Sequence, residues 1–363
     1  MKLHAKVLVI GGGPAGATAG KFLAEQGIDV ILIERNLSYV KPCGGGLSIS
    51  AFDELGISKA AIRKEVKTIR IVSPLGERVD IALKDSSLAI IERGEFDRTL
   101  RSVAESKGVK IMEGEFAGIL CDKYARVQVN RGEEKYEIVS EYVIAADGVN
   151  SRVRTVLGIR PSRSFFTASE HIKGIETECC EFWFGASFAP YSYAWAFPSS
   201  EGIAIGTGCF ETGKINALFE RFRKRKCIVS EGKKRIYRVP VWEGDLYNRG
   251  KILFAGDSAG QVLPLTYEGI YYAMRAGELA ALAIIDEKVN NYKKLWKDRF
   301  QKRFVLMDRL RKYFLKDDAS AEKLVAYHKR PEIQEASLRL WLRKDSGRES
   351  ILNYFRLFGK SLL

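Results

Sequence analysis

Residues 6–16 read Lys-Val-Leu-Val-Ile-Gly-Gly-Gly-Pro-Ala-Gly, and this stretch decides the fold. The apolar, β-branched run at 6–10 predicts a buried parallel strand. The glycines that follow have the G-x-G-x-x-G spacing, and residues 17–26 continue as a helix rich in small side chains. A second apolar strand at 29–34 ends in the carboxylate of Glu34. The pattern predicts a Rossmann-like α/β unit that binds a dinucleotide.

Each part of this unit has a physical role in holding a pyrophosphate. Gly11 permits a tight turn, Gly13 lets the phosphates approach the backbone, and Gly16 lets helix and strand pack closely. The helix N-terminus offers N–H groups and the positive end of its dipole. Glu34 can accept hydrogen bonds from ribose hydroxyls and disfavours a 2′-phosphate, which leaves FAD and NAD. The candidate binding residues here are Gly11, Gly13, Pro14, Ala15, Gly16, Glu34 and Arg35.

Two segments far downstream bear on the choice between these cofactors. Residues 142–154 form an apolar strand that runs into Asp147-Gly148 and then into a polar helix start. Residues 252–260 form another apolar strand that runs into Gly256-Asp257, and Glu268-Gly269-Ile270 leads a further helix. A chance match of all three segments, in this order and at this separation, is much less probable than a chance match of any one of them.

This order resembles the FAD-dependent oxidoreductases of the para-hydroxybenzoate hydroxylase fold. The resemblance implies that FAD is the cofactor and that Asp257 contacts its ribityl and pyrophosphate region. It also places the backbone from Gly269 onward beside the flavin ring. Arg93, within residues 91–97, matches a family arginine near the flavin, and Asp147 matches the middle segment. Gly256 and Ile270 are the remaining cofactor-binding candidates from these segments.

Two more motifs narrow the choice of family among the FAD-dependent oxidoreductases of this fold. Residues 41–46 read Lys-Pro-Cys-Gly-Gly-Gly, where a flat ring can lie against bare backbone. In residues 193–198, Tyr193, Trp195 and Phe197 alternate and would share one face of a strand. Together these motifs resemble the geranylgeranyl reductase family, in which the cysteine-glycine loop lies near the flavin and the aromatic strand lines the substrate cavity. The resemblance implies cofactor contacts for Cys43, Gly44 and Gly45 and catalytic roles for Cys43, Gly44, Gly45, Tyr193 and Trp195.

The resemblance implies FAD-dependent reduction of isoprenoid double bonds, with a prenylated archaeal-type ether lipid precursor or an isoprenoid diphosphate as substrate. The geranylgeranyl group of a chlorophyll precursor is an alternative. Cys43 is the candidate proton donor, because an unactivated alkene needs a nearby acid. Two other functions stay open on this fold: an oxygen-using hydroxylase or halogenase, and a membrane-associated electron-transfer flavoprotein. The electron donor is NAD(P)H or ferredoxin, since the chain has no second nucleotide-binding fingerprint.

Composition limits the compartment and the partners. No apolar run reaches the roughly 18–20 residues of a membrane span and no signal peptide precedes the fingerprint, so we expect a cytoplasmic protein. The net charge is +14, and basic residues concentrate at 221–226 and 288–363. These stretches suit ferredoxin or an anionic membrane surface, including the inner face of the cell membrane. No nucleic-acid motif accompanies them, and the scattered histidines and cysteines predict no metal site.

The expected fold class is α/β, with an interrupted Rossmann-like FAD-binding domain, a mostly antiparallel β-sheet substrate domain and a C-terminal helical region. A turn at residues 74–77 predicts a β-hairpin over residues 68–83. The expected domain bounds are 1–60, 85–160 and 245–290 for FAD binding, 61–84 and 161–244 for the substrate domain, and 291–363 for the helical region.

Overall fold

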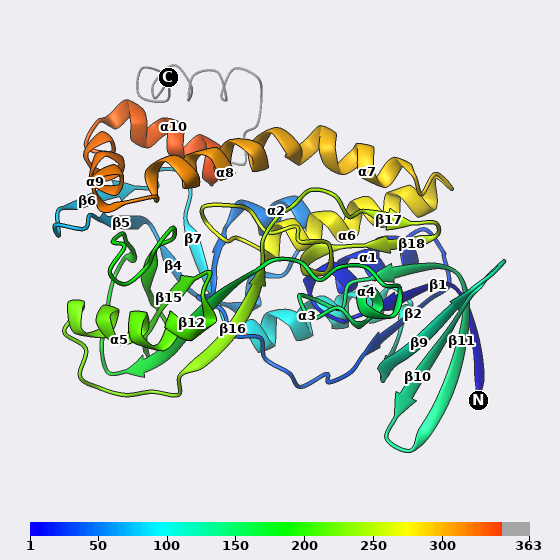
Figure 1. The fold of residues 1–363 in the computed structure, drawn as a ribbon. Helices are drawn as coiled ribbons and strands as arrows, with labels where there is room; N and C mark the ends of the chain where they lie inside the picture. Colours follow the sequence, from blue (N-terminus) through cyan, green and yellow to red (C-terminus); the bar gives the residue numbers. More distant parts are fainter. Residues whose placement is uncertain (343–363) are drawn as a thin grey trace. The chain divides into compact units, whose positions relative to one another are not determined.

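The computed structural model describes residues 1–342, and the chain divides into two compact units. Unit 1 comprises Met1–Val40, Gly94–Ser164 and Val239–Gln301. Unit 2 comprises Lys41–Arg93, Phe165–Arg238 and the chain from Lys302 onward. Residues 343–363, the end of the expected helical region, lie outside the described residues. Each unit is therefore assembled from segments that lie far apart in the sequence (Figure 1).

Unit 1 is built around an eight-stranded sheet. Its strands are β1 (Lys2–Ile10), β2 (Val30–Glu34), β8 (Lys110–Glu113), β9 (Glu115–Cys121), β10 (Ala125–Arg131), β11 (Glu134–Ala145), β17 (Asn248–Arg249) and β18 (Ile252–Phe254). The order β18-β11-β1-β2-β8 is parallel throughout. Strands β9 and β10 extend from β11 as an antiparallel ribbon (Figure 1). The parallel core confirms the Rossmann-like prediction.

The helices of unit 1 pack against this sheet. They are α1 (Pro14–Ala24), α3 (Arg93–Ser106), α4 (Arg152–Val156), α6 (Ile270–Ile285) and α7 (Asn291–Trp296), together with the 3-10 turn η3 (Gly256–Ala259) and the π-helical η4 (Lys297–Gln301). Alternate residues of β1 face opposite ways, so Leu8 joins a core cluster with β10 and β11 while Val9 approaches α1. Helices α1 and α6 lie backbone to backbone, because a Cβ on Gly277 would be 2.1 Å from the carbonyl oxygen of Ala15.

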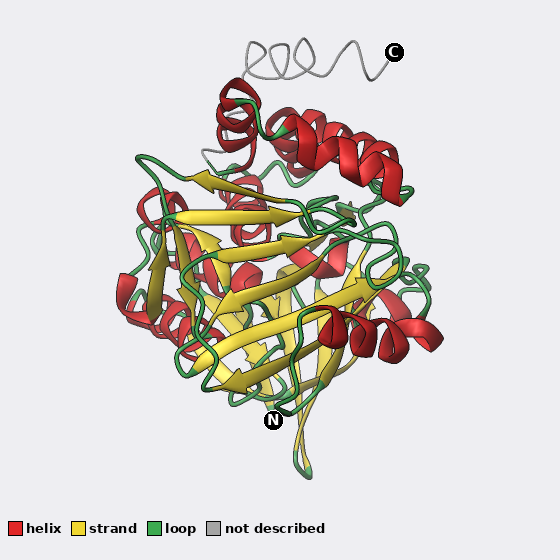
Figure 2. Ribbon diagram, turned by 90° about the vertical axis from the view of Figure 1, so that its left-hand side faces the viewer, coloured by secondary structure: helices red, strands yellow, loops and turns green. Residues whose placement is uncertain are grey.

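Unit 2 contains a seven-stranded sheet. Figure 2 draws the strands of both units in yellow. In sheet order its strands are β16 (Arg235–Pro240), β12 (Ser164–Lys173), β15 (Gly202–Cys209), β14 (Ala194–Pro198), β13 (Cys180–Trp183), β5 (Thr68–Val72) and β6 (Arg78–Ala82). The pairs β12–β15, β15–β14, β14–β13 and β5–β6 are antiparallel, and β13–β5 is parallel. The expected mostly antiparallel sheet and the β5–β6 hairpin are both confirmed.

A smaller sheet and the remaining helices complete unit 2. The sheet has the order β3 (Gly46–Ser48), β7 (Leu88–Ile91) and β4 (Ile62–Val66). The helices are α2 (Ser50–Leu55), η1 (Lys59–Ala61), η2 (Thr212–Lys214), α5 (Ile215–Arg225), α8 (Lys302–Phe314), α9 (Asp318–Tyr327) and α10 (Pro331–Trp341). Within residues 1–342, no helix has both the length and the apolarity needed to cross a membrane.

The compact units differ from the expected domain bounds at several boundaries. Residues 85–93 and the chain from Lys302 onward group with unit 2, and residues 161–164 and 239–244 group with unit 1. Two further differences, at residues 41–60 and 291–301, have a visible cause. Residues 41–60 group with unit 2 because β3 pairs with β7, which also pairs with β4. Residues 291–301 group with unit 1, because Tyr292 donates a hydrogen bond to the carbonyl of Phe254 at 2.9 Å and Trp296 packs on Tyr247. Strand pairing and aromatic packing across long sequence separations decide both boundaries.

Candidate active site

The strand ends of unit 1 bring the three glycine-containing segments together. Strands β2, β1, β11 and β18 are parallel neighbours, and segments 11–16, 146–148 and 256–257 leave the carboxyl ends of β1, β11 and β18. The amide of Ala146 donates to the carbonyl of Ile10 at 2.8 Å, which keeps the ladder intact up to this point. Ligands of open parallel sheets bind at this edge.

Glycines allow close contact between the backbones of these three segments. Gly11 has φ +105°, and a Cβ there would lie 2.3 Å from the carbonyl oxygen of Ala146. A Cβ on Gly16 would lie 1.9 Å from the carbonyl oxygen of Gly11. Gly256 has φ +70°, and its Cβ would meet that of Ala15 at 3.1 Å. A side chain at Gly11 or Gly16 would require the backbone to move.

Gly13 differs from the other glycines of the fingerprint. It is the N-cap of α1 with an extended backbone, and nothing lies within 4 Å of a Cβ placed on it. No side chain caps α1, and its first turn carries no acidic residue. A helix start with no side-chain cap and open space beside Gly13 is the arrangement of a phosphate-binding helix N-terminus.

A carboxylate and a buried arginine hold the loop that contains this fingerprint. Glu34 accepts hydrogen bonds from the amide of Gly12 at 2.7 Å and from the amide of Asn36 at 3.1 Å. Arg101 of α3 donates to the carbonyl of Gly12 at 3.2 Å and to that of Leu37 at 2.8 Å. The sequence analysis missed Arg101, because a base inside a helix carries no signal for a contact 89 residues away.

Two carboxylates lie at the same edge of the sheet. Asp147 accepts a hydrogen bond from the amide of Val153 at 3.1 Å through Oδ2, whereas its buried Oδ1 has no hydrogen-bond partner among the described residues. Burial raises the pKa of the Asp147 carboxyl. Asp257 Oδ1 lies 3.6 Å from the position of a Cβ on Gly269, the N-cap of α6, where no side chain caps the helix. A ligand with hydroxyl groups would satisfy the orphaned Asp147 oxygen.

The cysteine-glycine loop belongs to unit 2. Gly45 has φ +79°, and its amide donates to Cys43 Sγ at 3.3 Å. The amide of Ile91 donates to the carbonyl of Gly45 at 2.9 Å, which ties the loop to β7. The chain then passes from β7 to Arg93, a buried side chain at the start of α3. Backbone bonds thus fix the half-buried Cys43 thiol beside this strand.

The same loop lies against the aromatic strand β14. A Cβ on Gly44 would be 3.2 Å from the ring of Phe197 and 3.3 Å from Trp195 Nε1. That nitrogen is buried and has no hydrogen-bond partner among the described residues. The indole of Trp195 lies over its cross-strand partner Gly206, where a Cβ would be 2.1 Å from Cζ2. The sequence analysis missed Gly206, although a glycine pair at 206 and 208 follows the aromatic strand.

The rings continue from β14 across β13 to α10. The ring of Phe182 has its centroid 5.1 Å from that of Tyr193 and 5.6 Å from that of Trp341, both edge to face. Ser48 of β3 donates to the carbonyl of Leu342 at 3.1 Å, which fixes the end of α10. We call the set Phe182, Tyr193, Trp195, Phe197 and Trp341 the aromatic face. Trp341 was not predicted, because only the tertiary packing brings it to β13.

The two sides of the seven-stranded sheet differ in composition. Ala194 and Ala196 alternate with the rings of β14 and belong to a core cluster with Phe219 and Phe222 of α5. That side is a closed core. On the aromatic face, Tyr193, Trp195 and Trp341 are only half-buried. The predicted alternation of this strand is confirmed.

The predicted site residues therefore form two groups. The edge of the unit 1 sheet holds Gly11, Gly13, Pro14, Ala15, Gly16, Glu34, Asp147, Gly256, Asp257, Gly269 and Ile270. Unit 2 holds Cys43, Gly44, Gly45, Tyr193 and Trp195, with Arg93 at its boundary. Arg35 is exposed directly after β2. In the described part of the chain, no group of three or more His, Cys, Asp and Glu could hold a metal ion.

Comparisons with known proteins agree with this geometry. The FAD binding domain family matches residues 4–208. The chain is 34% identical over 331 residues to digeranylgeranylglycerophospholipid reductase 2 of Methanothermobacter thermautotrophicus, an alignment that covers 82% of this chain and 84% of that relative. It is 29% identical over 376 residues to geranylgeranyl diphosphate reductase of Synechocystis, with 93% and 92% covered.

A solved structure supports the fold. The chain is similar to a geranylgeranyl bacteriochlorophyll reductase-like protein from Thermoplasma acidophilum, with a TM-score of 0.87 over 100% of both chains at 22% identity. We call Gly11, Gly13, Gly16 and Gly256 the cradle. The cradle, the helix starts at Gly13 and Gly269 and the orphaned Asp147 oxygen fit FAD, which carries a pyrophosphate and a chain of hydroxyl groups. The chain belongs to the geranylgeranyl reductase family of FAD-dependent oxidoreductases.

Proposed function

We propose that the chain reduces carbon–carbon double bonds of geranylgeranyl groups on an archaeal-type ether lipid precursor. The observation that carries this proposal is the contact between the Cys43–Gly45 loop and the aromatic face. An isoprenoid chain has no polar group along its length, so burial against rings is its main source of binding energy. The relative named for a digeranylgeranylglycerophospholipid shares a larger fraction of identical residues than the diphosphate reductase does, which supports the lipid substrate.

The residues at the edge of the unit 1 sheet would hold the cofactor. The N–H groups at the start of α1, beside Gly13, would bind the pyrophosphate, and Glu34 would accept hydrogen bonds from the ribose. Asp147, Asp257 and the start of α6 would bind the ribityl chain and the flavin end. When bound and reduced by the electron donor, the flavin would supply the two electrons that each double bond needs.

Cys43 would hold a proton for the alkene at Sγ. Reduction of one double bond consumes two electrons and two protons, and one of these protons must come from an acid near the carbon. The amide of Gly45 donates to Sγ, so it engages a lone pair and leaves the S–H free to donate elsewhere. Trp195 and Phe197, packed on the same loop, would exclude water from this proton transfer.

Anaerobic turnover tests the proposal. The purified flavoprotein is reduced without oxygen and mixed with a digeranylgeranylglycerophospholipid or with geranylgeranyl diphosphate. We expect flavin reoxidation together with a mass gain of two hydrogens per double bond, and faster turnover of the lipid. A flavin that stays reduced with both substrates until oxygen enters would contradict the proposal and favour a hydroxylase or an electron carrier. NAD(P)H and ferredoxin are compared as donors in the same assay.

A further inference from the structure

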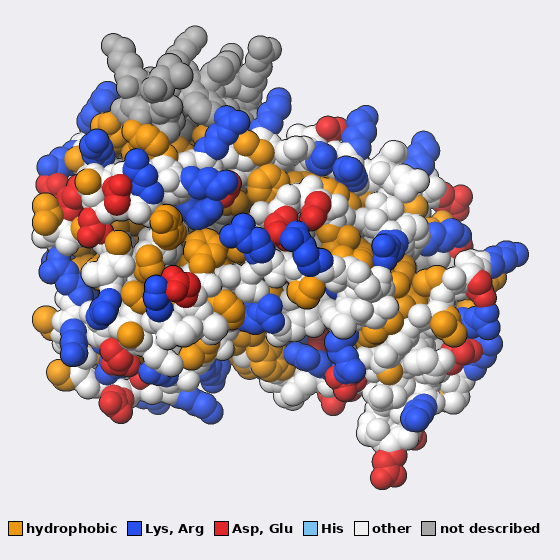
Figure 3. Space-filling model, viewed as in Figure 1, with side chains coloured by type: hydrophobic (Ala, Val, Ile, Leu, Met, Phe, Trp, Pro, Cys, Tyr) orange, Lys and Arg blue, Asp and Glu red, His pale blue; other side chains and the backbone are white. Residues whose placement is uncertain are grey.

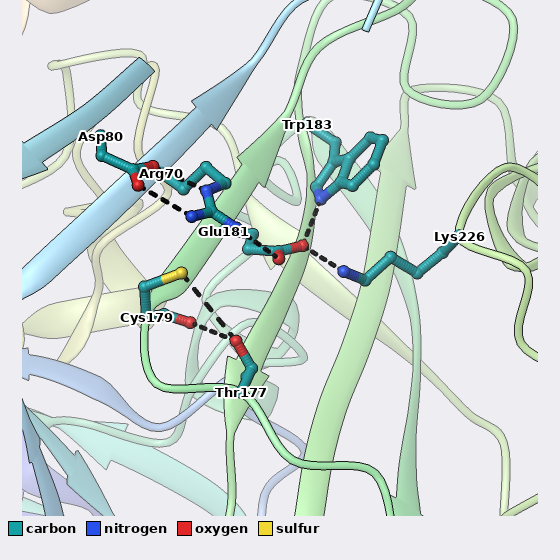
Figure 4. A network of polar contacts seen from close by, with 7 residues as sticks. All are labelled: Arg70, Asp80, Thr177, Cys179, Glu181, Trp183 and Lys226. Atoms are coloured by element: carbon teal, nitrogen blue, oxygen red, sulfur yellow. Dashed lines mark hydrogen bonds and ion pairs between the residues drawn. The ribbon is translucent and has the colours of Figure 1, made fainter. Parts of the chain in front are cut away.

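The fold divides the basic run of α5 into two sets. Residues 221–226 read Arg-Phe-Arg-Lys-Arg-Lys. Arg223 is buried and paired with the buried Glu170. Lys226 pairs with the buried Glu181 at 2.5 Å, within the network that Figure 4 shows. These two bases neutralise acids inside unit 2, so their charge has a structural role.

Arg221 and Arg225 have a different environment. They lie one helical turn apart, and both are exposed. Arg221 donates to the carbonyl of Ser187 at 3.3 Å, and Arg225 donates to the carbonyl of Pro74 at 3.1 Å. Neither forms an ion pair within residues 1–342. Since a guanidinium carries five N–H donors, each has donors to spare while one carbonyl holds it in place.

These two arginines line a cavity of about 390 Å³. The other lining residues are Pro74, Gly185, Ser187, Phe188 and Asp318. The Asp318 carboxylate is already engaged, because it accepts a hydrogen bond from the amide of Ala186 at 2.6 Å. Phe188 also packs in the core cluster with Phe222, so the cavity lies on the α5 side of the sheet and not on the aromatic face.

We propose that this cavity is an oxyanion site that binds a phosphate group between Arg221 and Arg225, apart from the reaction site. The planar guanidinium forks match phosphate oxygens in bidentate geometry, and the carbonyl bonds restrict both side chains before binding. Two positive charges exceed the single carboxylate of the lining. Basic and acidic side chains are interspersed over the face in Figure 3, so the paired arginines and the cavity, and not a uniform basic surface, define the site. A phospholipid headgroup and free phosphate share this chemistry.

Binding measurements on the full-length FAD-loaded protein test the site. The variant Arg221→Gln/Arg225→Gln is compared with Lys224→Gln/Lys233→Gln, which removes the same charge from exposed lysines outside the cavity. Titration calorimetry with inorganic phosphate and flotation with vesicles of phosphatidic acid or of phosphatidylcholine alone are the probes. We expect the arginine variant to bind at least about tenfold more weakly and the lysine variant to stay within about twofold.

The outcomes distinguish free phosphate from a lipid headgroup as the ligand. They also distinguish a specific site at the two arginines from a general effect of positive charge. Loss of calorimetric phosphate binding assigns a soluble ligand, and loss confined to phosphatidic acid vesicles assigns a lipid headgroup. The proposal is overturned if the unmodified protein binds neither probe, or if both double variants lose binding equally. Arg221→Lys/Arg225→Lys keeps the charge without the fork and should bind with intermediate strength. The flavin absorbance and the melting temperature of each variant report its folding, and neither depends on prenyl reductase activity.

Discussion

The cradle of unit 1 is built from backbone, whereas the aromatic face of unit 2 is built from side chains. In the cradle, the space for a Cβ on Gly11 or Gly16 is taken by a carbonyl oxygen at 2.3 or 1.9 Å. At the aromatic face, the space on Gly206 is taken by the ring of Trp195 at 2.1 Å. A ring can rotate away, but a carbonyl moves only with its strand. The cradle is therefore the rigid part of the enzyme, and under the proposed function the aromatic face is where substrate preference can be adjusted.

The strongest test of the rigid part is Gly16→Ala. The new Cβ would overlap the carbonyl oxygen of Gly11, so β1 and α1 must separate. We expect a loss of at least about 3 kcal/mol in the free energy of unfolding and a protein purified without flavin. Urea unfolding and the flavin absorbance measure the two effects.

Gly13→Ala is the matched control for this substitution. Its Cβ would enter open space with an allowed backbone, so the free energy of unfolding should change by less than about 0.5 kcal/mol. FAD should nevertheless bind at least about tenfold more weakly, because the methyl group occupies the space in front of the α1 N–H groups. Equal FAD affinity in this variant would show that the open space is not the phosphate site.

Cys43→Ala tests the proton transfer proposed for Cys43 in unit 2. If Sγ holds the proton, turnover should fall about 100-fold while FAD binding stays unchanged. Cys43→Ser, which keeps a hydrogen-bond donor, should recover part of the rate. Single-turnover reoxidation of the reduced flavin by substrate isolates this step from flavin reduction. Full turnover of the alanine variant with an unchanged product pattern would remove Cys43 from the mechanism.

The sequence alone predicted the strand–helix–strand geometry of the cradle, because its parts are local, and the contacts of its residues with the cofactor stay a prediction. Gly11, Gly13, Gly16 and Glu34 lie within one strand–helix–strand unit, and each role follows from its neighbours in the chain. Asp257 also follows a strand end directly. The pattern could not show that the amide of Gly12 occupies one oxygen of Glu34, since that contact depends on the path of the loop.

The supporting residues of both regions were not predicted, because tertiary packing gives them their roles. Arg101 contacts Gly12 from a helix that begins 81 residues later in the chain. Gly206 matters only because β15 pairs with β14 in the register that places it opposite Trp195. Trp341 reaches Phe182 only after α10 has docked. Which strands pair and which helix covers them is set by packing, and no local pattern encodes it.

Gly206→Ala tests whether that register positions Trp195. The methyl group would overlap Cζ2 of the indole, so the ring must turn away from β15. We expect kcat/KM for the prenyl substrate to fall about tenfold, with FAD binding and the flavin spectrum unchanged. Gly213→Ala, where nothing lies within 4 Å of the new Cβ, is the control in the same unit. Equal activity of both variants would indicate that the indole orientation does not matter.

The smallest effect is expected from Trp341→Ala, which alters the outer limit of the aromatic face. Trp341 meets Phe182 edge to face and is half-buried, so its removal leaves room beside Phe182 without uncovering the core of the sheet. We expect the kcat/KM ratio of a prenyl chain one isoprene unit longer to that of the geranylgeranyl substrate to rise about threefold. Trp341→Phe should keep the original ratio.

Trp183→Phe is the control for this ratio, because Trp183 packs against Phe222 on the opposite side of the same sheet. Its loss removes the hydrogen bond to Glu181, so it should lower stability without changing the ratio. Competition between the two chain lengths in one reaction, read by mass spectrometry, measures the ratio independently of the amount of active enzyme. A ratio that moves equally in the Trp183 and Trp341 variants would mean that general loosening of unit 2, and not the limit of the aromatic face, sets the chain-length preference.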